Sequence, residues 1–191
     1  MNMAANKLGR FLVHSVELES QAQERYLELA EIMAGHGNQP VADFFRRMAG
    51  EASLHLLEVT RIAVGVQLPQ LKAWEFEWPE VEGPETTSYD AVYHQMSLRQ
   101  AMLLALDNER AAEQYYRYVA HSTDDPETAR IANDFADEEL SHAASLQRLL
   151  DNLPPDENRQ PDDKGPQHRR RSPWKLAWPP PLPLFLAPEC G

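Results

Sequence analysis

Apolar residues recur at helical spacing in four stretches of the chain, and turn-forming residues separate these stretches. The stretches run from about residue 7 to 35, 39 to 64, 97 to 121 and 126 to 153. Apolar side chains that repeat about every 3.6 residues line one face of a helix. The pattern therefore predicts an all-α protein built from four long amphipathic helices.

Three of these helices begin at recognisable start signals. Asn38 precedes Pro40, Asp125 precedes Pro126, and Ser97 stands just before the third apolar stretch. Side chains of this kind accept hydrogen bonds from the free N–H groups of a first helical turn, and proline fits that turn. We predict Asn38, Ser97 and Asp125 as N-caps.

The segment from residue 65 to 93 does not continue the helical pattern. Pro69, Pro79 and Pro84 break any helix there. A connection this long between helices has a structural reason when it joins two parallel helices, because it must travel the length of the bundle. We predict a long crossover between the second and third helices. Its aromatic residues are expected to pack on the bundle: Trp74, Phe76 and Trp78.

Residues 154–191 differ in composition from the rest, since they hold ten of the fifteen prolines. We predict two parts, a helical bundle over 1–153 and a proline-rich, flexible tail over 154–191. The tail is either an unpacked extension or a peptide that docks on a protein partner.

The first and third helices share a pattern, and so do the second and fourth. The first pattern is Glu-x-x-Ala-x-x-x-Tyr-x-x-x-Ala, formed by Glu19, Ala22, Tyr26 and Ala30 and again by Glu109, Ala112, Tyr116 and Ala120. The second is formed by Ala49, Glu51 and His55 and again by Ala136, Glu138 and His142. A helical hairpin that repeats in this way predicts a pseudo-twofold bundle in which matching positions face each other.

Each repeat offers a glutamate on one helix and a histidine on the next. Glu139 and His142 are three residues apart, so they share one helix face. Carboxylates and imidazoles without thiolates suit iron or manganese. The alternatives are solvated surface glutamates and a structural histidine, but the repeat favours metal binding. Tyr26 and Tyr116 are predicted to pack in the core or to hydrogen-bond to ligands.

Composition excludes several other classes of protein. A net charge of −12 argues against general nucleic-acid binding, and no apolar run is long enough to cross a membrane. The start of the chain lacks the apolar core of a signal peptide, so we expect a cytoplasmic protein. Cys190 is the only cysteine of the 191 residues, which rules out a four-cysteine metal module formed by them.

At these residues the chain resembles the rubrerythrin branch of the ferritin-like superfamily, over about residues 8–153. Glu19-Ser20-Gln21-Ala22-x-x-Arg25-Tyr26 is similar to the first-helix signature of that family, and Glu139-x-x-His142 to its fourth-helix signature. The resemblance implies a four-helix bundle that holds two non-haem irons, with manganese as an alternative metal. It further implies that Glu19 and Glu109 are terminal ligands, that Glu139 bridges, and that His55 and His142 bind one iron each.

Two positions depart from the family pattern. The glutamate expected three residues before His55 is Ala52, for which Glu51 is a candidate substitute, and the extra glutamate of the third helix is Ala112. The rubredoxin-type four-cysteine domain is missing from these residues. If Glu51 does not substitute at the position of Ala52, the centre has one bridging carboxylate instead of two, which would weaken it, leave it with a single metal or tune it to another task.

The resemblance implies a di-iron oxidoreductase of the peroxidase or ferroxidase type. Its oxidant would be peroxide or oxygen, and its electrons would come from a separate donor. A homodimer is also expected. The alternatives are an iron-oxidising, iron-handling protein and a non-enzymatic ferritin-like scaffold that acts through its tail.

Overall fold

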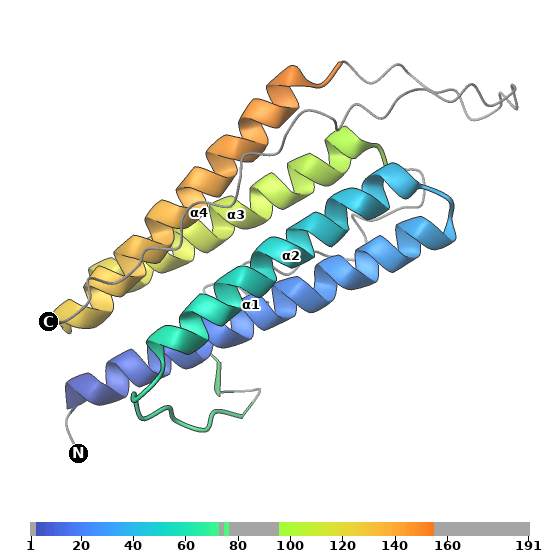
Figure 1. Cartoon of the computed structure of the whole chain (residues 1–191). Helices are drawn as coiled ribbons and strands as arrows, with labels where there is room; N and C mark the ends of the chain where they lie inside the picture. The colour runs from blue at the N-terminus through green and yellow to red at the C-terminus, as the bar shows by residue number, and fades with distance from the viewer. Residues whose placement is uncertain (1–2, 73–74, 77–95, 155–191) are drawn as a thin grey trace, which may run out of the picture.

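The computed structural model describes residues 3–72, 75–76 and 96–154 and forms a bundle of four long α-helices (Figure 1). The helices are α1 (Met3–Gly35), α2 (Gln39–Ile62), α3 (Leu98–Ser122) and α4 (Pro126–Asn152). They agree with the four predicted stretches to within a few residues. The all-α, four-helix prediction is therefore confirmed.

The four helices form two antiparallel hairpins that lie side by side (Figure 1). Helix α1 packs along α2 and α3 packs along α4, while the two hairpins approach each other at fewer points. Helices α2 and α3 run in the same direction, so the end of α2 and the start of α3 lie at opposite ends of the bundle (Figure 1). The predicted crossover between them is confirmed.

Two of the three predicted N-caps use their side chains. The Ser97 hydroxyl accepts from the backbone N–H of Gln100, whose side chain accepts from the Ser97 N–H. Asp125 accepts from the Thr128 N–H at 3.0 Å. The prediction was wrong in this respect for Asn38, which stands at the N-cap position without a capping hydrogen bond. Its side-chain amide instead donates to the Met96 carbonyl at 2.8 Å, a tertiary contact that ties the first hairpin turn to the start of α3.

The first part of the crossover segment lies against α1. A Cβ atom on Gly9 would lie 2.5 Å from the Gln67 carbonyl oxygen, so only glycine permits this close approach. Further along, the Phe76 ring contacts the His14 ring at 4.9 Å between centroids. Trp74 and Trp78 lie outside the described residues, as does the predicted tail from residue 155 onward.

The apolar core consists of two separate clusters along the bundle axis. The cluster nearer the hairpin turn at Gly37 contains residues such as Tyr26, Phe45 and Leu146, and the other contains residues such as Leu12, Tyr116 and Phe135. Buried ionisable residues occupy the length of helix between them, with Glu19 placed between Leu18 of one cluster and Ala22 of the other. The fold thus positions a polar layer in the middle of the bundle.

Among the described helices, none has a stretch of the length and apolar character needed to span a membrane.

Candidate metal centre

Five ionisable side chains converge in the polar layer, and every helix supplies at least one of them. Glu19 comes from α1, His55 from α2, Glu109 from α3, and both Glu139 and His142 from α4. The three glutamates are at most 8% exposed, so the structure places them in the core rather than on the surface. The alternative of solvated surface glutamates is therefore excluded by the fold.

The carboxylate of Glu139 lies between the two histidines. His55 Nδ1 is 3.4 Å from Glu139 Oε1 and 3.6 Å from Glu19 Oε1. His142 Nδ1 is 3.5 Å from Glu139 Oε2 and 3.6 Å from Glu109 Oε2. Glu139 thus presents one oxygen to each half of the centre, and each half adds one further glutamate.

These contacts define two groups of candidate ligands that share one member. Glu19, His55 and Glu139 each offer one ligand atom, and these atoms lie within 4.8 Å of one another. Glu109, Glu139 and His142 form the matching group in the other hairpin. This is the pseudo-twofold arrangement that the repeat predicts, with Glu139 at its centre. The assignment of the five residues as ligands itself stays a prediction.

Burial and mutual contacts shift the pKa values of all five groups. Burial raises the pKa of Glu19 and raises that of Glu109 to about 8. Burial acts upward on Glu139 as well, but hydrogen bonds from His142 and His55 hold its pKa well below the ordinary value. Burial acts downward on the histidines, yet the glutamates around them raise the pKa of His142 to about 10 and that of His55 well above its usual range. The metal-free centre therefore retains protons that a bound cation would displace.

Two buried tyrosines approach the centre from opposite clusters. Tyr116 donates from its hydroxyl to Glu19 Oε1 at 3.3 Å. Its role as the support of a ligand stays a prediction. Tyr26 accepts a hydrogen bond at 3.1 Å from the side-chain amide of Asn108, the residue before Glu109. Asn108 is 8% exposed and was not singled out by the sequence, since an isolated helical asparagine carries no pattern.

Ala52 lies in α2 and is 6% exposed, and its methyl side chain offers no carboxylate to the centre. Glu51, the candidate substitute, belongs to none of the groups of candidate ligands found among the described residues. Glu138 does belong to one, together with His55 and His142. Glu138 occupies the position in the second hairpin that Glu51 occupies in the first. The repeat therefore pointed to both glutamates and did not show which one belongs to a ligand group.

The donor set fits a pair of hard divalent cations. Three buried carboxylates in an apolar core are costly unless cations, protons or hydrogen bonds compensate them. Two imidazoles provide the nitrogen ligands that iron and manganese accept beside carboxylates. Glu19, His55 and Glu139 would hold one cation, and Glu109, His142 and Glu139 the other.

The comparisons with known proteins agree with this geometry. A family model described as rubrerythrin matches residues 10–102 and 100–176. The crystal structure of an uncharacterised conserved protein from Magnetospirillum magnetotacticum MS-1 is similar, with 32% sequence identity and a TM-score of 0.60. The match covers 81% of this chain and 97% of that one. The search of curated proteins gave no match.

Proposed function

Because the chain belongs to the rubrerythrin family of ferritin-like proteins, we propose that it is a non-haem di-iron oxidoreductase that reduces peroxide or oxygen. The observation that carries this proposal is the position of Glu139. Its two oxygens face two histidines from different hairpins, at 3.4 and 3.5 Å. Two cations a few ångströms apart repel each other, and a shared carboxylate between them offsets that repulsion.

Iron would supply the redox chemistry, which in the reduction of peroxide is the transfer of two electrons to the O–O bond. The protein residues supply protons and exclude bulk water. Glu109 has a pKa of about 8, so near neutral pH its carboxyl group exchanges a proton with its surroundings in the metal-free protein. Tyr116 orients Glu19 through its hydroxyl. Phe135 lines the pocket at the centre and thereby helps to exclude bulk solvent.

Size and charge also favour a small oxidant. The pocket beside the centre is narrow and is lined mainly by carboxylates, with Val59 and Phe135 as its apolar members. A neutral molecule of the size of peroxide or oxygen would enter it without electrostatic repulsion, whereas a large or anionic substrate would not.

The electrons would come from a separate donor. The 191 residues contain one cysteine, so they form no four-cysteine iron centre of their own to relay electrons. A partner protein that carries such a centre is one class of donor. We further propose that the chain acts as a homodimer in the cytoplasm.

An iron-oxidising, iron-handling role is the second candidate, and the acidic lining of the pocket favours it. Glu58 and Glu138 stand beside Glu19 and Glu139 in this pocket, so cations are attracted toward the centre. In this case Fe²⁺ would be both the metal that binds and the source of electrons.

Anaerobic loading with Fe²⁺ followed by mixing with peroxide tests both candidates. The proposal expects about two tightly bound irons per chain and rapid, stoichiometric oxidation that a reductant reverses through repeated cycles. An iron-handling protein would instead oxidise many more than two irons per chain. A full-length protein that binds no Fe²⁺ would refute both and leave the scaffold function.

A further inference from the structure

Glu138 lies next to Glu139 in sequence but takes a different position at the centre. Its side chain is half-buried, whereas that of Glu139 is almost completely buried. Both line the pocket between α2 and α4, together with Glu19, His55 and Glu58. Glu138 therefore stands on the path between solvent and the buried carboxylates.

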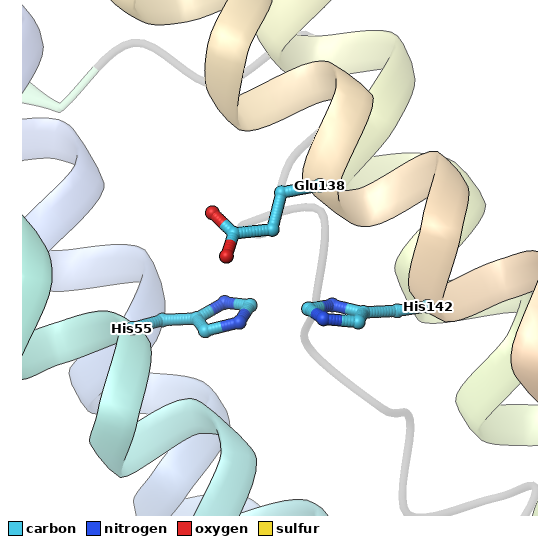
Figure 2. A group of neighbouring side chains, drawn as sticks. All are labelled: His55, Glu138 and His142. Carbon is cyan, nitrogen blue, oxygen red and sulfur yellow. The ribbon is translucent and has the colours of Figure 1, made fainter. Parts of the chain in front are cut away.

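The Glu138 carboxylate faces both histidines (Figure 2). One ligand atom from each of Glu138, His55 and His142 lies within 4.8 Å of the other two. The two imidazole rings are stacked with their centroids 4.7 Å apart, so both are presented to the same side of the centre. The arrangement combines one carboxylate with two imidazoles, a ligand set that binds divalent cations in many proteins.

The third group shares its histidines with the two groups around Glu139. His55 belongs also to the group with Glu19, and His142 also to the group with Glu109. A cation held by Glu138 is therefore already in contact with residues that belong to the inner positions. To move inward it keeps one histidine and exchanges Glu138 and the other histidine for Glu139 and either Glu19 or Glu109. Glu138 and Glu139 are neighbours on one helix.

We propose that His55, Glu138 and His142 form a third cation-binding position, which receives a divalent cation from solvent before it passes to the buried carboxylates. This inference rests on the proposed function, because it presumes that the inner positions bind metal. It assigns Glu138 a role in loading the centre rather than in the loaded centre itself. Among the described residues, Glu138 forms a candidate ligand group with both histidines, whereas Ala52 offers no carboxylate.

The test measures the rate at which the metal-free, full-length protein takes up Co²⁺, followed by stopped-flow absorbance. When Co²⁺ is limiting, the loading rate is proportional to the occupancy of the first position that it meets. Loss of a residue that only hydrogen-bonds to a metal ligand already lowers affinity by about 10- to 100-fold, so loss of a direct ligand should cost at least as much. We expect Glu138→Gln to slow loading by about tenfold or more, with the final stoichiometry unchanged. Glu138→Ala serves as a second variant with the same expectation.

Two matched variants separate coordination from charge. Glu58→Gln removes the same charge from the same pocket but from a residue outside the third group. Glu51→Gln removes the glutamate at the equivalent position of the repeat. Glu58→Gln is expected to slow loading only by the loss of one attracting charge, well short of the effect at Glu138, and Glu51→Gln to load at close to the rate of the unaltered protein.

Three results would overturn the inference. The first is that the Glu138 variants load at the normal rate. The second is that they bind less cobalt at saturation, which would make Glu138 a permanent ligand. The third is that Glu58→Gln slows loading to the same extent, in which case charge alone explains the effect. An unaltered protein that binds no Co²⁺ would refute the proposed function as well. That outcome is distinct from normal binding with no effect at Glu138.

Discussion

Replacing Glu139 by glutamine removes the one charge on which both halves of the centre depend. Glutamine has nearly the same shape, so the change tests charge and metal ligation rather than packing. Glu139 is 2% exposed and lies 3.4 and 3.5 Å from the Nδ1 atoms of His55 and His142. Both histidines have raised pKa values, and they are therefore protonated in the metal-free protein near neutral pH.

The size of the effect follows from these distances. At an effective dielectric constant of about 20, each pair of unit charges at such a separation attracts with about 5 kcal/mol. Glu19 and Glu109 retain part of this attraction in the variant. The net loss should therefore be about 3–5 kcal/mol, the usual cost of removing one partner from a buried ion pair. For a domain of this size, about 2–4 °C per kcal/mol corresponds to a fall in Tm of roughly 6–20 °C.

Two assays on the same preparations measure the two consequences. Thermal unfolding of the metal-free protein reports the loss of stability. Elemental analysis after anaerobic Fe²⁺ loading reports bound metal, which should fall from about two irons per chain to one or fewer. Glu51→Gln is the matched control, since it makes the same substitution in a half-buried residue outside the candidate ligand groups. It should change stability by less than about 0.5 kcal/mol.

Equal losses of Tm and metal content in Glu139→Gln and Glu51→Gln would contradict the role assigned to Glu139. Such a result would mean that the contacts of Glu139 with the histidines contribute no more than an ordinary helix carboxylate. An unchanged Tm with lost metal would separate the two effects, and would show that the histidines are neutral in the metal-free protein.

Three further predictions concern the missing carboxylate, protons and the end of the chain. Ala52→Glu should lower the Tm of the metal-free protein, because it buries another carboxylate, and it should raise the number of irons bound per chain. A metal content that does not rise would contradict the assignment of Ala52 to the bridging position. Metal binding at pH 7 should release protons held by His55, His142 and Glu109, whose pKa values are raised. Apparent affinity should therefore increase with pH through about 8 to 10, which calorimetry in buffers of different ionisation enthalpy would detect as proton release. Deleting residues 155–191 should leave Tm and metal content unchanged, because Arg99 already donates to the carbonyls of Leu150 in α4 and of Leu153, the residue that follows the helix. A large fall in Tm would contradict this.

The four helices were predictable because their determinants are local. The apolar spacing and the caps at Ser97 and Asp125 act within one or two turns, and each is realised in the structure. The parallel direction of α2 and α3 followed from the length and proline content of the segment between them. Asn38 shows the limit of such reasoning, since its side chain bonds to Met96, which is 58 residues away in sequence. Local chemistry favoured a cap, and a tertiary contact took its place.

The convergence of the five ionisable residues was predictable from the repeat, because duplicated hairpins place equivalent positions opposite each other. The difference between Glu51 and Glu138 was not, since both stand four residues before their histidine. Which of the two side chains turns toward the centre depends on the rotation of each helix within the packed bundle. That rotation is set by contacts between the hairpins, which the repeat leaves undetermined.

The polar layer also links the stability of the bundle to its occupancy by metal. The layer separates two apolar clusters that would otherwise form one continuous core, so its charges must be compensated for the hairpins to pack. Near neutral pH the metal-free layer is compensated by protons on His55, on His142 and on Glu109, whose pKa is about 8, and a glutamate at position 52 would add one more buried carboxylate that needs compensation. Alanine at that position therefore favours a bundle that stays folded without metal. The same residue leaves Glu139 as the one carboxylate shared by both candidate ligand groups, so a chain that tolerates the metal-free state should bind its second cation less tightly.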